Sequence, residues 1–152
     1  MKDRRQDRGV TLVELLVVLA IVSLAVALAL PYSARSAGAQ RYAAFVQTAA
    51  AELRNARMQA VFSNRESVLT IDLDGRTLSL GASGRSRTIP DGIDLAVVTS
   101  AGEVRGGSAG FRFFPDGTST GGRIVVTYQG KKKMIAVSWL TGGVQTTASE
   151  VE

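Results

Sequence analysis

The sequence predicts an α+β protein in which one long N-terminal helix packs on a small antiparallel β-sandwich-like domain. Residues 10–30 form an almost uninterrupted apolar run. Residues 41–62 then carry apolar side chains at steps of three and four, the spacing of one helix face. From residue 67 onward, short alternating segments are separated by glycine-containing turns, and 16 glycines against 3 prolines agree with many tight turns.

The apolar run is long enough to cross a membrane as a helix. Only Thr11, Glu14 and Ser23 interrupt residues 10–30 with polar side chains. At about 1.5 Å per residue, this helix matches the roughly 30 Å of a bilayer hydrocarbon core. The preceding residues 1–9 carry four basic and two acidic side chains, so the positive-inside rule predicts a cytoplasmic leader. The C-terminal part is then expected outside the cytoplasm.

Glu14 is the unusual residue of this run. A carboxylate within a membrane span costs about 2.5–3.5 kcal/mol on insertion scales, so such a residue is usually functional and paired. Cleavage between Gly9 and Val10 would create an α-amino group at a similar depth. Within one helix the two groups are poorly placed to meet, whereas two staggered parallel helices bring them together. Glu14 therefore predicts lateral assembly.

Residues 8–14, Arg-Gly-Val-Thr-Leu-Val-Glu, resemble the processing motif of type IV pilins and pseudopilins. The resemblance implies cleavage after Gly9 by a prepilin peptidase and N-methylation of Val10. Val10 departs from the usual phenylalanine of the motif, which bears on methylation more than on cleavage. Pro31 falls where many such proteins bend their long helix, because proline removes a backbone hydrogen bond.

Two plainer interpretations of the N-terminus compete with this one. A secretory signal peptide would be cut after residues 37–39, Ala-Gly-Ala, which form an acceptable small-residue site. The apolar run exceeds the usual length for such a peptide and contains Glu14. A simple signal anchor would leave both Glu14 and the Gly9 junction unexplained.

The helix is expected to continue beyond the membrane as an amphipathic segment over residues 31–64, ending near Ser63 and Asn64. Alanine and arginine, which are frequent here, have good intrinsic helix propensity. We expect its apolar face to pack on a sheet. That face consists of Tyr42, Phe45, Val46, Ala49, Leu53, Ala56 and Ala60.

The rest of the chain reads as short strands. A hairpin is expected between residues 67–73 and 77–80 around Asp74-Gly75, a strong turn signal. Residues 81–87 and 99–110 are expected as loops. Pro115, Asp116 and Gly117 suit a tight turn. Further strands are expected at 93–98, 111–114, 123–128, 134–139 and from 144 onward, with residues 129–133 as the turn of the last hairpin.

A second resemblance lies in the C-terminal half. Residues 113–122, Phe-Phe-Pro-Asp-Gly-Thr-Ser-Thr-Gly-Gly, and residues 137–142, Val-Ser-Trp-Leu-Thr-Gly, are similar to the H-type minor pseudopilins of the type II secretion system, the GspH/FimT group. The resemblance implies a pilin-like fold. DNA-binding members carry arginines after the last Thr-Gly block, where this chain has Gly143 and Gln145, so charge-assisted phosphate contacts are missing there.

Within this block we single out a candidate partner-contact loop. Its residues are Pro115, Asp116, Gly117, Ser119, Thr120, Gly121 and Gly122.

Composition argues against catalysis and against bound cofactors. The chain has no histidine and no cysteine, which removes the commonest general base and the commonest metal ligands. Asp72 and Asp74 lack the remaining ligands of a calcium loop. The glycines of 99–110 lack the Gly-Lys-Ser/Thr ending of a phosphate loop. We therefore expect no catalytic residue, no cofactor and no metal.

Charge gives little support to nucleic-acid binding. The net charge of +5 falls to +3 without residues 1–9, an ordinary value for solubility. Lys131, Lys132 and Lys133 form the densest basic run, expected at a solvated hairpin tip, with phosphate binding as the alternative. Nucleic acid is not expected as a partner.

Together these observations predict four segments: a cytoplasmic leader at 1–9, a transmembrane segment at 10–30, the amphipathic continuation at 31–64 and a periplasmic β-rich domain at 65–152. The resemblance implies a non-enzymatic minor pseudopilin in the bacterial inner membrane, passing into a pseudopilus. Expected partners are a prepilin peptidase, other major and minor pseudopilins and secreted cargo. The alternatives are a minor type IV pilin, in pilus assembly or DNA uptake, and an enzyme on a membrane anchor.

Overall fold

The computed structural model describes residues 11–81 and 84–148, except for the side chains of residues 28–36 and 85. Gly9, Val10 and the leader therefore lie outside the described residues. The chain divides into two compact units, Met1–Gly38 and Ala39–Glu152. Helix α1, Leu12–Ser63, contributes residues to both units.

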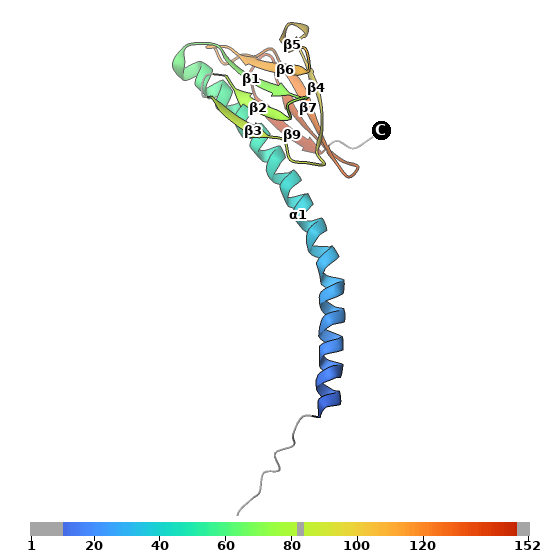
Figure 1. The fold of residues 1–152 in the computed structure, drawn as a ribbon. Coiled ribbons are helices and arrows are strands. Elements are labelled where there is room, and N and C mark those ends of the chain that lie inside the picture. The colour runs from blue at the N-terminus through green and yellow to red at the C-terminus, as the bar shows by residue number, and fades with distance from the viewer. Residues whose placement is uncertain (1–10, 82–83, 149–152) are drawn as a thin grey trace, which may run out of the picture. The chain divides into compact units, whose positions relative to one another are not determined.

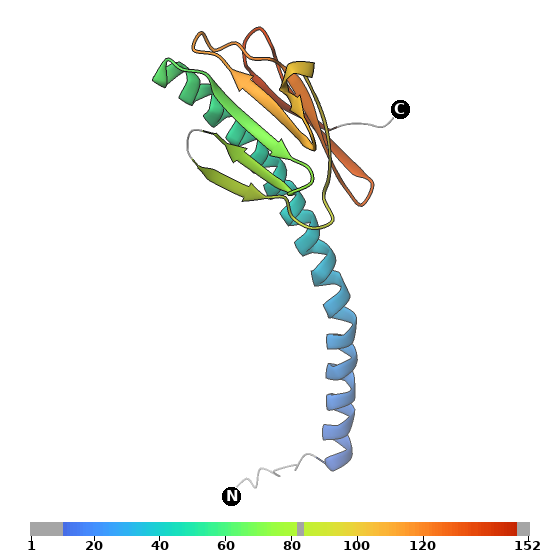
Figure 2. The ribbon, with the colours of Figure 1, turned by 45° about the horizontal axis from the view of Figure 1, so that its top comes forward.

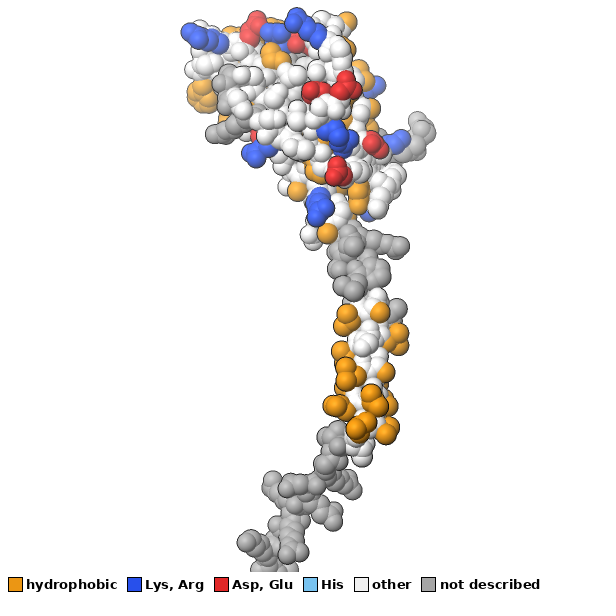
Figure 3. Space-filling view, in the orientation of Figure 1, with side chains coloured by type: hydrophobic (Ala, Val, Ile, Leu, Met, Phe, Trp, Pro, Cys, Tyr) orange, Lys and Arg blue, Asp and Glu red, His pale blue; other side chains and the backbone are white. Residues whose placement is uncertain are grey.

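In the first unit, α1 presents apolar side chains to its surroundings. The described side chains from Thr11 to residue 27 are all exposed, and Figure 3 shows apolar groups covering the visible face of this stretch. Among the residues whose side chains are described, no helical stretch combines the length and hydropathy of a membrane span. The predicted span 10–30 includes residue 10 and residues 28–30, which lie outside that set. The bend expected at Pro31 falls in the same gap and stays a prediction.

The second unit contains two antiparallel sheets. The five-stranded sheet has the order β3-β2-β1-β6-β5, and the four-stranded sheet has the order β4-β7-β8-β9. The C-terminal part of α1 lies against the strands (Figures 1 and 2). The strands are β1 Ser67–Asp72, β2 Thr77–Leu80, β3 Arg85–Thr88, β4 Asp94–Thr99, β5 Val104–Arg105, β6 Ser108–Phe113, β7 Gly122–Tyr128, β8 Lys131–Val137 and β9 Val144–Ala148. The predicted α+β class with antiparallel sheets is confirmed.

The apolar face of α1 forms the core together with both sheets. All seven residues predicted for that face are buried, and Leu53, Ala56 and Ala60 are fully inaccessible. The first sheet contributes Leu69, Ile71, Phe111 and Phe113, among others, and the second contributes Ile124, Val126, Ile135 and Val137. Burying a large apolar side chain stabilises a fold by about 1.5–3 kcal/mol. This core therefore holds the helix face and the sheets together as one unit.

Tyr42 joins the helix to the second sheet in a more specific way. Its ring stacks on that of Tyr128, with 5.8 Å between the centroids. Its hydroxyl donates to the carbonyl of Val126 at 3.2 Å. Burial raises the pKa of Tyr42 above its ordinary value, so the hydroxyl stays protonated and remains a donor.

Four local expectations were wrong. Residues 85–87, expected as part of a loop, belong to β3, because Arg85, Ser86, Arg87 and Thr88 pair with β2 at an edge of the sheet, where no apolar alternation is needed. Within residues 99–110, expected as a loop, the chain forms the 3₁₀ turn η1 Ala101–Glu103, strand β5 and the start of β6.

The last hairpin is also tighter than predicted. Gln129 and Gly130 alone form its turn, with positive φ angles of 47° and 78°, as a type I′ turn requires. The three lysines 131–133 therefore lie in β8, where Lys131 pairs with Tyr128, and not at a loop tip. At the other end, β8 stops at Val137, so Trp139 lies in a turn and not in a strand.

Candidate functional site

The start of α1 carries the first candidate site. Thr11 precedes the helix and accepts a hydrogen bond from the Glu14 backbone N–H through Oγ1, at 3.3 Å. The Thr11 carbonyl accepts the first helical bond from the Leu15 N–H at 3.1 Å. Thr11 is therefore the N-cap, and Glu14 is the third helical residue. Its carboxylate lies in the first turn, where the helix dipole favours negative charge.

The sequence carried a signal for this cap that we did not use. Threonine followed three residues later by glutamate is the capping-box pattern. In the described residues Glu14 is exposed and has no ion-pair partner, amid apolar side chains. No described residue therefore blocks the Glu14 carboxylate from the predicted pairing with a neighbour's α-amine. The pairing itself stays a prediction, as do cleavage after Gly9 and methylation of Val10.

The predicted contact loop begins with the expected tight turn. The Gly117 N–H donates to the Phe114 carbonyl at 2.9 Å, which places Pro115 second and Gly117 fourth. The exposed Asp116 accepts two hydrogen bonds at Oδ1, from the Thr118 N–H at 3.0 Å and from its hydroxyl at 2.7 Å. These bonds stabilise the carboxylate and hold the pKa of Asp116 below its ordinary value.

The second half of this loop is directed into the protein. Ser119 is buried; its N–H donates to the Trp139 carbonyl at 2.9 Å, and its hydroxyl accepts from the Gly121 N–H at 2.9 Å. Thr120 exchanges two hydrogen bonds with the backbone of Arg112. Gly122 is the first residue of β7. Of the seven predicted contact residues, only Asp116 is exposed, so much of the block serves to connect β6 with the turn after β8.

Arg57 fastens this loop to the helix. Its Nε donates to the Gly117 carbonyl at 3.1 Å. Gly117 and Gly142 both have positive φ, 85° and 60°. A Cβ atom on Gly142 would lie 2.3 Å from the Gly117 carbonyl oxygen and 2.9 Å from Arg57 Cδ. The turns that contain Gly117 and Gly142 therefore touch each other and close around the Arg57 side chain. This arrangement arises only from tertiary packing.

Exposed apolar side chains lie beside this clamp. Met58 lines a cavity of ≈ 300 Å³ together with Gly142 and Gly143, so the end of α1 and the turn after β8 are neighbours. We use the term exposed apolar set for Met58, Phe62, Trp139 and Leu140, whose exposed fractions are 52%, 85%, 68% and 61%. Tryptophan, methionine and phenylalanine are enriched in protein–protein interfaces. Phe62, Trp139 and Leu140 are the three most exposed large apolar side chains among the described residues of the second unit.

The described residues contain no cluster of three or more side chains suited to hold a metal ion. Asp72, one of the two aspartates considered for calcium, instead accepts the Gly75 N–H at 2.8 Å within the β1–β2 turn.

Comparison with known proteins gives consistent results along the chain. Residues 4–30 match the prokaryotic N-terminal methylation motif, and residues 46–143 match the family described as Type II transport protein GspH. The type II secretion system protein H of Xanthomonas campestris pv. campestris is 32% identical over 145 residues, covering 94% of this chain and 85% of that protein.

Two solved structures share the fold. The minor pseudopilin EpsH from the type 2 secretion system of Vibrio cholerae has a TM-score of 0.53 at 15% identity, covering 67% of this chain and 92% of that one. The type IV minor pilin FimU of Pseudomonas aeruginosa has a TM-score of 0.54 at 20% identity, covering 77% and 92%. At these identities the likeness concerns the fold alone.

Proposed function

Since the chain belongs to the GspH family of type II transport proteins, we propose that it is a minor pseudopilin, a subunit of the type II secretion pseudopilus. The observation that carries this proposal is the co-occurrence of two matches in one chain, the N-terminal methylation motif at 4–30 and the GspH family at 46–143. Its role is to build a filament, not to catalyse a reaction.

Maturation begins in the membrane. A prepilin peptidase cleaves after Gly9 and methylates the new N-terminus at Val10. Residues 10–30 hold the subunit in the inner membrane, with the basic leader in the cytoplasm and residues 65–152 in the periplasm. The methylation motif and the apolar composition of the run support this order of events.

Assembly depends on Glu14. An unpaired carboxylate in the hydrocarbon layer costs about 2.5–3.5 kcal/mol, and pairing with the α-amine of a neighbouring subunit lets the two opposite charges neutralise each other there. Only one axial stagger places the first residue of one helix beside the fifth residue of another. The Thr11 cap supports this role, because it fixes Glu14 in the first helical turn.

The second unit supplies contacts outside the membrane. The exposed apolar set, next to the loop that Arg57 holds in place, is the surface that we assign to neighbouring subunits or cargo. The Arg57 clamp keeps the turn bearing Trp139 and Leu140 in one conformation, which reduces the entropy lost on binding.

The test is a clean deletion in the native host, complemented with the wild-type gene and scored for secreted protein, twitching motility and DNA uptake. We expect secretion to be lost while motility and uptake persist. Normal secretion with lost motility or uptake would instead assign the chain to a type IV pilus.

A further inference from the structure

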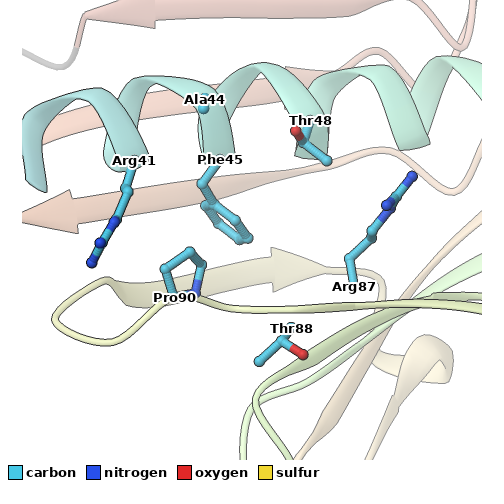
Figure 4. Close-up of a pocket in the computed structure, with 7 residues that line it drawn as sticks. All are labelled: Arg41, Ala44, Phe45, Thr48, Arg87, Thr88 and Pro90. Atoms are coloured by element: carbon cyan, nitrogen blue, oxygen red, sulfur yellow. The ribbon is translucent and has the colours of Figure 1, made fainter. Parts of the chain in front are cut away.

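A groove lies between α1 and the segment 87–90 in the second unit. It has a volume of ≈ 310 Å³, within the range of small ligand sites. Figure 4 shows Phe45 pointing from α1 towards Pro90, with Arg41 and Arg87 on either side of this apolar centre. The groove therefore has an apolar floor between two positive ends.

Both guanidinium groups have N–H donors without a partner among the described residues. Arg41 is exposed and makes no hydrogen bond or ion pair with any described residue. Arg87 pairs with Glu52 through Nε alone, at 3.3 Å, while its side chain stays 57% exposed. The Glu52 side chain is only 11% exposed and does not line the groove. It therefore orients Arg87 without placing a negative charge in the groove. The two ends thus remain able to bind an anion.

The remaining polar lining also consists of donors. Thr48 and Thr88 line the groove, and neither hydroxyl has a hydrogen-bond partner among the described residues. None of the lining residues is acidic. A site with arginine and hydroxyl donors around an apolar floor matches a carboxylate carried on an aliphatic stem.

The wall opposite the helix is held in place. Arg76 donates from one guanidinium nitrogen to the carbonyls of Pro90 and Ile93, at 2.9 and 3.0 Å. The Ile89 N–H donates to the Arg76 carbonyl at 2.9 Å. Because the backbone of this turn is fixed, the groove needs little reorganisation to accept a ligand.

We propose that this groove receives an acidic side chain of a neighbouring filament subunit, with Arg41 and Arg87 contacting its carboxylate. The proposal rests on the proposed function, since it needs other subunits beside this one. If the subunits assemble through parallel N-terminal helices, the part of each helix just outside the membrane faces a neighbour. Arg41, Ala44 and Thr48 lie on that part of α1.

A lipid headgroup fits this position less well. Arg41 comes eleven residues after the proposed span, which in a helix amounts to about 16 Å. The headgroup layer on one side of a bilayer is only about 5–8 Å thick. A protein carboxylate is the ligand that the location favours.

The experiment uses the full chain in its host, with photoreactive benzoylphenylalanine in place of Ala44, an exposed residue of the groove. We expect an adduct with another pseudopilin, and a crosslinked peptide that contains aspartate or glutamate. Arg41→Glu should lower the adduct yield at least about tenfold, as expected when a charge-assisted hydrogen bond gives way to repulsion. Arg41→Lys should keep most of the yield.

Two further variants isolate the cause. The double variant Glu52→Gln with Arg87→Gln removes the second cation without leaving Glu52 unpaired, and it should also lower the yield. Arg123→Glu changes the net charge equally at an exposed site outside the groove, and it should have no effect.

Equal yields from the wild type and Arg41→Glu, or adducts with lipid only, would overturn the proposal. A second photoreactive position, Leu140, separates this failure from failure of the proposed function. Subunit adducts from Leu140 but none from Ala44 refute the groove alone, whereas no subunit adduct from either position refutes both.

Discussion

Substituting alanine for Gly142 should strongly destabilise the second unit. Gly142 has φ of 60°, where a residue with a Cβ atom pays about 1–2 kcal/mol. The added Cβ would lie 2.3 Å from the Gly117 carbonyl oxygen, a backbone atom that cannot swing away. Overpacking of this kind costs about 1–3 kcal/mol. We expect a total loss of about 2–5 kcal/mol.

Gly130 provides a matched control. Its φ is 78°, but a Cβ atom there would meet nothing within 4 Å. Gly130→Ala should therefore lower the unfolding free energy only by the cost of a positive φ. The entropy that alanine removes from the unfolded chain is the same for both variants and cancels in the difference. Urea unfolding of residues 39–152 with unchanged m values measures both costs. If Gly142→Ala costs no more than Gly130→Ala, the contact between the two turns around Arg57 is wrong.

Three further results are expected. Arg112 bonds to Glu103 at 2.7 Å and to Glu66 at 2.7 Å, and the Glu103 side chain is only 12% exposed. Arg112→Ala should therefore lower the unfolding free energy in urea by about 1–2 kcal/mol, and it should lower it by less when Glu103 is already alanine. Fully additive losses in the double variant would contradict the pairing. The pKa of Asp116 is lowered in the folded state, so the stability it contributes is present above its ordinary value of 3.8 and is lost as the pH falls through the lowered folded pKa. The protection factor of the Thr118 amide, its exchange rate relative to the unfolded chain at the same pH, should therefore fall in acid, and Asp116→Asn should remove that pH dependence. Trp139→Ser should change the unfolding free energy by no more than about 0.5 kcal/mol, because the side chain is 68% exposed. The same variant should lower secretion in the complemented host. Unchanged secretion would show that Trp139 is not part of the contact surface.

Much of the fold followed from local patterns. The apolar stripe on the second part of the helix, from Tyr42 to Ala60, predicted its buried face because burial follows the helical period directly. Asp74-Gly75 and Pro115 marked their turns because turns favour aspartate, glycine and proline, glycine for its conformational freedom and proline for its fixed φ. Strand β3 escaped prediction because an edge strand is held by backbone hydrogen bonds, and its polar side chains leave no apolar alternation to detect.

The candidate site was only partly predictable. The roles of Gly9, Val10 and Glu14 stay predictions from a contiguous motif, and the Thr11 cap belongs to a known pattern that was overlooked. The Arg57 clamp joins residues about 60 and 85 positions apart in the chain, and the groove joins Arg41 to Arg87. No local pattern encodes such contacts, because they arise only when the sheets pack on the helix. For the same reason, the burial of Ser119 and Gly121 was not foreseen in the predicted contact loop.

We propose that this chain joins a secretion pseudopilus through Glu14. This proposal is tested most directly by crosslinking host membranes, recovering the tagged protein and quantifying the other pseudopilins bound to it, for the wild type and for Glu14→Leu. We expect both proteins to reach the membrane in equal amounts and only the wild type to recover the other subunits. Equal recovery by Glu14→Leu, or no recovery by the wild type, would contradict the proposal.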